Sequence, residues 1–272
     1  MAISTISDTQ ADIPAKVGGW FLRRSRFMLN LADQSAVFWR CLLSSPSLGN
    51  PSIKAVLLKQ IYFTGLEGWK IITVLSLILG TIIVNQVVGL VGGGSGSLPG
   101  KVLIWVVFRE LAPLLTAIIV IARSGTAIAA ELGAMKINGE IASLEQMGIA
   151  PERYLILPRI VGVACSVLVL TIYFVLTAFV GGFLIVSVGR HIALDQFLQG
   201  IISSLGFGEI LLLTLKTICF GLIIPLICCQ AGGSVGTSAT EIPQAATKAV
   251  INSLFAVFML DGVITLLASL MF

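Results

Sequence analysis

Five long apolar stretches dominate the pattern of hydrophobic and polar positions along the chain. They cover residues 69–91, 101–122, 154–188, 210–229 and 250–272. An apolar helix of about 20 residues is long enough to cross the hydrocarbon core of a bilayer. Because the alternating pattern of a membrane β-barrel is missing, helices are the expected way to satisfy the backbone in lipid. The pattern predicts an all-α polytopic membrane protein with five transmembrane helices.

The polar segment before the first span predicts a different kind of structure. Residues 1–15 are expected to form a flexible cytoplasmic tail, and residues 16–62 interfacial or elbow helices. In 16–43, tryptophans and other apolar residues recur at helical spacing beside several arginines, which is typical of a helix lying on anionic lipid. A soluble helix packed on a partner is the alternative. Residues 63–272 are expected to form a single transmembrane domain.

The distribution of basic residues predicts the orientation of the spans. Lysine and arginine gather in the N-terminal segment, in the connection 123–159 and at Lys248. The positive-inside rule therefore places the N-terminus in the cytoplasm and, with five spans, the C-terminus on the outer side. Residues 92–97 are expected to form a tight glycine-rich turn. Residues 189–209, which include the only histidine, His191, are expected to be a polar connection.

Composition excludes several classes of function. The chain has 57% hydrophobic and 11% charged residues, and its small net charge of +4 fits membrane orientation better than nucleic-acid binding. The five cysteines form no C-x-x-C pair, so neither a zinc site nor a disulfide framework is indicated. The sequence contains no phosphate-binding loop and no hydrolase motif, and it predicts no cofactor in this chain.

Charged residues inside apolar spans are costly and are functional candidates. Arg109 lies eight residues after Lys101, about 12 Å along a helix. Its guanidinium could bind a phosphate or carboxylate, or it could belong to a structural ion pair with Glu110 or Asp261. For Asp261 and Lys216, structural pairing is favoured over a proton relay, because a relay would be expected to show several acids and a histidine within the spans.

A short helix is predicted at 138–148, on the cytoplasmic side. Asn138 can cap its start, Glu140 suits its first turn, and Gly148 followed by Pro151 predicts its end. So short a helix needs a surface to pack against, either its own transmembrane bundle or a groove on a partner. The small residues of 124–134 allow helices to approach closely. Ile137, Ile141, Leu144 and Met147 form its apolar stripe, with Glu145 and Gln146 elsewhere.

Several of these segments resemble the MlaE/YrbE permease family. The resemblance rests on R-E-L-A-P-L-L-T-A at 109–117, A-R-S-G-T-A-I-A-A-E-L-G-A-M at 122–135 and E-Q-M-G-I-A-P at 145–151. The motifs A-T-K-A-V-I-N-S at 246–253 and L-D-G-V-I-T at 260–265 also fit, so that the resemblance covers roughly 50–272. The family's members are transmembrane subunits of ABC transporters that work with MCE-domain proteins.

This resemblance implies a homodimeric permease in the bacterial inner membrane, seated on a cytoplasmic ATPase dimer and beneath a periplasmic ring of MCE-domain subunits. The chain itself would be non-catalytic, with ATP and Mg bound by the ATPase, and its cargo would be a phospholipid moved between inner and outer membranes. The segment 138–148 would be the coupling helix. An ion- or proton-coupled secondary transporter and a non-transporting membrane scaffold are the alternatives.

The resemblance also implies roles for individual residues. At the base of the fifth helix this chain has Lys248 where familiar relatives have arginine, which argues against bidentate phosphate binding at that position. The implied substrate-binding residues are Arg109, Glu110, Lys248, Leu75, Leu79 and Ile83. The implied coupling residues are Asn138, Glu140, Ile141, Leu144, Glu145 and Met147.

Overall fold

The computed structural model describes residues 51–91, 97–189 and 194–271. The chain divides into two units, Met1–Pro46 and Ser47–Phe272, and all that follows concerns the second. Four predictions lie outside the described residues: the tail 1–15, the amphipathic helix 16–43, most of the glycine-rich turn, and the position of His191.

The described residues form helices and no β-strand, and five helical stretches are long and apolar enough to cross a membrane. This confirms the all-α polytopic fold. The stretches are Lys54–Leu90, Leu98–Ile137, Glu152–Leu184, Phe207–Gly233 and Glu241–Leu270. The helices, with η marking π-helical segments, are α2 (Pro51–Ile61), η2 (Tyr62–Leu66), α3 (Trp69–Val91), α4 (Leu98–Val102), η3 (Leu103–Leu111), α5 (Ala112–Val120), η4 (Ile121–Gly125), α6 (Thr126–Ile137), α7 (Glu140–Gln146), η5 (Glu152–Ile156), α8 (Leu157–Gly189), α9 (Leu194–Ser204), α10 (Phe207–Gly233) and α11 (Glu241–Met271).

Helix limits agree with the prediction at the first span and extend beyond it at the others. The limits of α3 are those predicted, 69–91, whereas the second stretch continues past 122 to Ile137. The segment 231–248, which lies between the fourth and fifth predicted spans, is also mostly helical, because α10 ends at Gly233 and α11 begins at Glu241. Hydropathy marks only the part of a helix at hydrocarbon depth, while backbone hydrogen bonding continues through polar and small residues beyond it.

The connection 189–209, predicted to be only a polar link, contains the helix α9. Phe197 and Ile201 of α9 are buried, and the Phe197 ring lies 5.9 Å from that of Phe183 in α8. Leu198 and Ile202 are exposed beside them, so apolar residues recur at the spacing of an amphipathic helix. The backbone of Gly200 approaches that of Ser97 too closely for a side chain at position 200.

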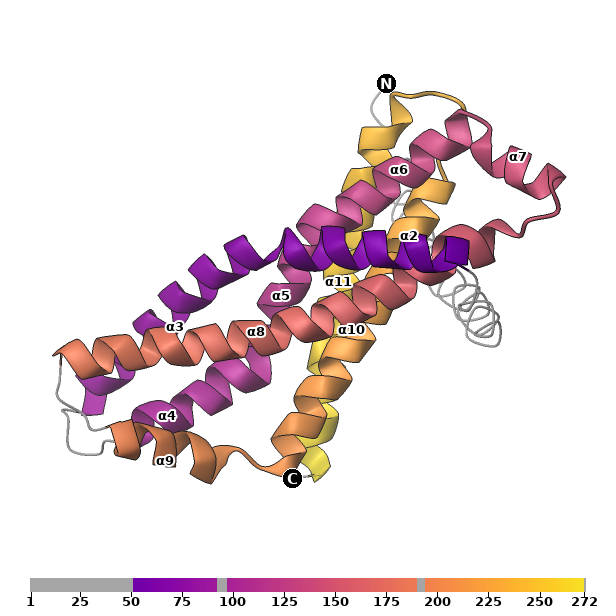
Figure 1. Cartoon of the computed structure of the whole chain (residues 1–272). Coiled ribbons are helices and arrows are strands. Elements are labelled where there is room, and N and C mark those ends of the chain that lie inside the picture. Colours follow the sequence, from indigo (N-terminus) through magenta and orange to yellow (C-terminus); the bar gives the residue numbers. More distant parts are fainter. Residues whose placement is uncertain (1–50, 92–96, 190–193, 272) are drawn as a thin grey trace, which may run out of the picture. The chain divides into compact units, whose positions relative to one another are not determined.

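The packing of α3 against α8 depends on glycines. The two helices run side by side (Figure 1). A Cβ at Gly80 would overlap the carbonyl oxygen of Ala178, and one at Gly181 would lie 2.6 Å from the carbonyl oxygen of Leu77. Small residues of this kind let transmembrane helices approach closely and gain van der Waals contact. A hydrogen bond of 2.8 Å between the hydroxyls of Thr73 and Tyr173 also joins the two helices.

We expect Gly80→Ala to lower the free energy of unfolding by about 1–3 kcal/mol, because a methyl group there must push α8 away. Gly89→Ala is the matched control, since it lies on the same helix and nothing lies within 4 Å of its Cβ position. That variant should be neutral or slightly stabilising through its higher helix propensity. Thermal unfolding of both variants in detergent would test this, and equal melting temperatures would contradict the close packing.

The small residues of 124–134 also lie at a close helix contact, as predicted. A Cβ at Gly232 in α10 would lie 2.6 Å from the carbonyl oxygen of Ala129 in α6, and a Cβ at Gly133 would lie 3.1 Å from Val235. Helices α6, α10 and α11 therefore pack tightly around this segment.

Candidate functional site

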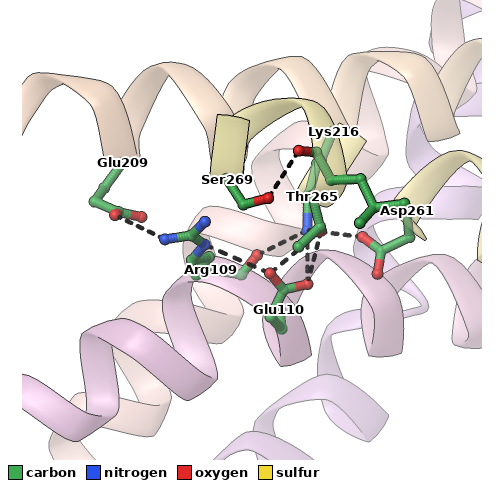
Figure 2. A network of polar contacts seen from close by, with 8 residues as sticks. Arg109, Glu110, Glu209, Lys216, Asp261, Thr265 and Ser269 are labelled. Atoms are coloured by element: carbon green, nitrogen blue, oxygen red, sulfur yellow. Dashed lines mark hydrogen bonds and ion pairs between the residues drawn. The ribbon is translucent and has the colours of Figure 1, made fainter. Parts of the chain in front are cut away.

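A network of charged and polar side chains lies between three membrane-spanning helices (Figure 2). Arg109 and Glu110 come from η3, in the second span, and Glu209 and Lys216 from α10. Helix α11 contributes Asp261 and Thr265. The four charged residues singled out from the sequence, Arg109, Glu110, Lys216 and Asp261, thus lie in one connected cluster.

Lys216 is at the centre of this network. Its side chain is 0% exposed, and its ammonium lies 2.7 Å from Glu110 Oε2 and 2.9 Å from Asp261 Oδ1. It also donates a hydrogen bond of 2.8 Å to the hydroxyl of Thr265. These partners, two of them carboxylates, compensate for removing the charge from water. Lys216 therefore ties the second, fourth and fifth spans together.

Lys216 also contacts a backbone carbonyl that would bond the N–H of residue 113 if that residue were not proline. In an α-helix the N–H of residue 113 would bond the carbonyl of Arg109, but proline has no N–H to give. Lys216 Nζ donates to this carbonyl at 3.3 Å. An acceptor without a partner is costly at membrane depth. The lysine thus neutralises two carboxylates and also helps to satisfy a backbone group next to a proline.

Arg109 is held much less firmly than Lys216. Its guanidinium lies 3.6 Å from Glu110 Oε1 and 3.5 Å from Glu209 Oε1, longer than the roughly 2.7–3.2 Å of an ordinary N–H···O hydrogen bond. Its side chain is 28% exposed. A guanidinium carries five N–H donors in a planar fork suited to carboxylate and phosphate oxygens. Arg109 is therefore the member of the network that can change partners without breaking a short contact.

Glu209 and Thr265 belong to this network, although sequence reasoning did not select them. Glu209 lies in the first turn of α10, where the helix dipole favours an acid. Its Oε2 is buried and has no hydrogen-bond partner among the described residues. Two cations, Arg109 and Lys216, thus face three carboxylates. An acid at the predicted start of a span was the available signal for Glu209, whereas nothing in the sequence distinguishes Thr265 from other threonines.

The remaining residues predicted to bind substrate lie elsewhere. Lys248 is exposed near the start of α11, thirteen residues before Asp261 and about 20 Å away along the helix. Leu75, Leu79 and Ile83 form one stripe of α3 and are partly buried against the hydrophobic core. Their contact with acyl chains stays a prediction, and Lys248 does not share a site with Arg109.

The predicted cytoplasmic helix is present as α7, but it starts differently from the prediction. Helix α6 ends at Ile137 with Asn138 as its C-cap residue, and Gly139, with φ of 73°, occupies the N-cap position of α7 without a side-chain cap. The prediction that Asn138 caps the helix is wrong; its side-chain amide instead donates to Glu140 at 3.2 Å. A left-handed residue reverses the chain sharply, and glycine adopts that conformation without steric cost.

The end of α7 agrees with the prediction from Gly148. Gly148 has φ of 73°. Its N–H donates to the carbonyl of Glu145 at 2.9 Å, and the N–H of Ile149 donates to the carbonyl of Leu144 at 3.0 Å. This pair of bonds is a Schellman motif, which satisfies carbonyls at the end of a helix. The helix is thus defined by a glycine on each side.

Helix α7 lies beyond the end of α6, with chain on both sides leading back to the bundle (Figure 1). None of its residues is buried. Ile141 and Leu144 pack partly against the core cluster, whereas Met147 is 65% exposed. Ile137 belongs to α6, because the turn at Gly139 separates it from the predicted stripe. One part of the apolar stripe therefore contacts the protein's own bundle, and the other part is uncovered.

Comparison with known proteins finds similarity over most of the chain. The family model described as permease MlaE matches residues 57–267, which include all of the network and α7. The chain is 28% identical over 250 residues to the intermembrane phospholipid transport system permease protein MlaE of Haemophilus influenzae, covering 88% of this chain and 96% of that protein. It is 29% identical over 202 residues to a probable ABC transporter permease protein of Synechocystis sp., covering 74% and 77%. Since the family match spans well over half of its length, the chain belongs to the MlaE permease family.

Proposed function

We propose that this chain is the transmembrane subunit of an ABC transporter that moves phospholipids between the inner and outer membranes, driven by a separate ATPase subunit. The observation that carries the proposal is the family match over residues 57–267, which contains both the intramembrane network and the exposed helix α7. The name of the Haemophilus influenzae relative supports phospholipid as the cargo.

In this proposal the network has two parts with different roles. Lys216, Glu110 and Asp261 form short contacts and hold the three spans in place. Arg109, with its long contacts and partial exposure, binds the phosphate of the cargo as it passes. Charge-assisted bonds from a guanidinium to phosphate are strong and can be bidentate, so a phosphate competes well with two loosely placed carboxylates. Glu110 takes part by positioning Lys216 and Arg109.

The proposed partners follow from the same assignment. The uncovered face of α7 would enter a groove on a cytoplasmic ATPase dimer, and ATP hydrolysis there would drive the permease. Two copies of this chain would form a homodimer in the inner membrane, with the N-terminus and α7 in the cytoplasm, the C-terminus in the periplasm, and a ring of MCE-domain subunits above.

Met147→Asp should sharply reduce co-purification of the ATPase subunit from cells that express both proteins. Met147 is 65% exposed, so the variant can fold, while a charge in an apolar contact should weaken binding. Loss of an apolar anchor costs about 2 kcal/mol at an interface, which lowers affinity more than tenfold. The ratio of ATPase to permease after affinity purification measures the effect.

Ala142→Asp is the matched control, because it adds the same charge to α7 at an exposed position about 140° around the helix from position 147. It should reduce recovery of the ATPase much less. Equal recovery with wild type and Met147→Asp would contradict docking through this face. Lipid transport in vesicles that contain the chain alone, driven by an ion gradient, would instead favour the secondary transporter.

A further inference from the structure

A cavity with charged side chains in its wall lies toward the opposite end of the second span from Arg109. It has a volume of about 470 Å³ and lies between α2, η2, α6 and α8. Its wall includes Lys59, Glu67, Glu131 and Arg159, together with the aromatic rings of Tyr62 and Phe63. The volume is within the range of about 300–1,000 Å³ typical of small-molecule sites.

Arg159, in the wall of this cavity, has a hydrogen-bond donor without a partner among the described residues. The residue is only 4% exposed, and its Nη2 lies 2.8 Å from Glu131 Oε2. Its Nη1 is buried and has no hydrogen-bond partner among the residues that the structure describes. Buried polar groups are nearly always paired, and an unpaired N–H of a charged group is especially costly. An acceptor that reached Arg159 from the cavity would satisfy this donor.

The charges around the cavity favour an anionic acceptor. Both acids of the wall are already paired, Glu131 with Arg159 and Glu67 with Arg123, whose guanidinium also lies 4.9 Å from the centre of the Phe63 ring. Lys59 forms no ion pair with any described residue. Three cations and two carboxylates leave one positive charge in excess. A phosphate group would satisfy both Arg159 Nη1 and Lys59.

The surroundings favour a lipid as the source of that phosphate. Glu67 lies just before α3, and Arg159 lies near the start of α8, so the cavity is at the ends of membrane spans. Tyr62 lines the cavity, and Leu58 and Leu66, four residues before and after it, are like it exposed apolar side chains. A phosphate with acyl chains can use both the charged cavity and this apolar stripe, whereas inorganic phosphate uses only the cavity.

We propose that this cavity binds the phosphate headgroup of a membrane lipid, held by Arg159 and Lys59, at a site separate from the Arg109 network. Arg123, next to the cavity, lies fourteen residues after Arg109 on one continuous helical stretch, or about 21 Å away. The proposal goes beyond the proposed cargo site, since it needs neither an ATPase nor transport. It gives the chain a lipid contact at the end that carries α7.

Calorimetric titration of the purified full chain in detergent would test the site. Three probes are compared: dioctanoyl phosphatidic acid, dioctanoylglycerol, which has the same chains without phosphate, and inorganic phosphate. All titrations use the Arg109→Ala background, so that the other site does not contribute to the signal. We expect the phosphatidic acid to bind about tenfold or more tightly than either of the other probes.

Two variants locate the binding. Arg159→Lys keeps the charge but loses the fork, and it should weaken binding of the phosphatidic acid by about tenfold. Lys59→Gln, at an exposed position that tolerates substitution, should weaken it several-fold. Lys54→Gln is the control, since Lys54 is exposed on the same helix but does not line the cavity, and it should bind as the parent does.

Other results would overturn the proposal. Binding unchanged by both Arg159→Lys and Lys59→Gln would place the lipid elsewhere. Equal binding of dioctanoylglycerol would exclude recognition of phosphate, and equal binding of inorganic phosphate would assign the cavity to a soluble anion rather than a lipid. Because Lys59→Gln changes an exposed side chain, its result stands even if Arg159→Lys fails to fold.

Discussion

Lys216→Met should lower the free energy of unfolding by about 3–5 kcal/mol, the typical cost of removing one partner from a buried ion pair. Lys216 is 0% exposed and contacts Glu110, Asp261 and Thr265 at 2.7–2.9 Å. Methionine has a similar volume, so the loss comes from electrostatics rather than from a cavity. Two carboxylates would be left facing each other at membrane depth, and the carbonyl of Arg109 would lose its ammonium partner.

The cause can be separated from general damage by restoring neutrality. Adding Glu110→Gln and Asp261→Asn to Lys216→Met removes both carboxylates that the lysine neutralised, and this triple variant should recover a large part of the lost stability. Lys248→Met, at an exposed lysine of α11, is the control and should leave the melting temperature nearly unchanged. Thermal unfolding in detergent measures all three. Equal destabilisation by the single and triple variants would contradict the ion-pair explanation.

The transmembrane architecture could be predicted because apolar length reports directly on the lipid environment. The limits of α3 agree with the sequence prediction because Gly68 and the glycine-rich segment after Val91 bound a continuous apolar run. The other spans continue into segments such as 124–137, in which many residues are polar or small yet still helical. Hydropathy does not report on those turns, since their hydrogen bonds are made outside the hydrocarbon core.

The members of the site could be predicted more readily than its pairing. Charges such as Lys216 and Asp261 stand out in an apolar sequence because burying them is costly. Which carboxylate meets which cation depends on the rotation and depth of three helices, which one sequence does not specify. Arg159 was missed for a related reason: at the start of a span it looks like an ordinary positive-inside residue, and only the structure shows its burial.

The prediction for α7 was right where backbone conformation alone decides and wrong where a side chain decides. Gly148 ends the helix because the left-handed conformation strongly favours glycine. Asn138 was expected to cap the start, but Gly139 takes the left-handed conformation at the N-cap position of α7, and Asn138 is instead the C-cap residue of α6. The apolar stripe was divided as a consequence, which no periodicity in the sequence reveals.

Arg109→Ala should reduce phospholipid transport by about tenfold or more while leaving the fold nearly intact. The contacts of Arg109 to Glu110 and Glu209 are long, 3.6 and 3.5 Å, and its side chain is 28% exposed, so little stability is lost. A phosphate that passes this position would lose its charge-assisted donors. Transport of a fluorescent phospholipid by the permease reconstituted with its ATPase in vesicles measures the effect, with thermal unfolding measured alongside.

The two interpretations of Arg109 give opposite results in this pair of measurements. If Arg109 binds cargo, Arg109→Lys should restore only part of the transport, because an ammonium lacks the planar fork. Glu209→Gln should then preserve transport or increase it, since a carboxylate that competes with the phosphate has been neutralised. If Arg109 is instead a structural ion pair, Arg109→Ala should lower the melting temperature as Lys216→Met does, and Glu209→Gln should be destabilising as well. If Arg109→Ala destabilises the protein as much as Lys216→Met does and leaves lipid binding unchanged, Arg109 has a structural role. The cargo phosphate would then have to be bound elsewhere.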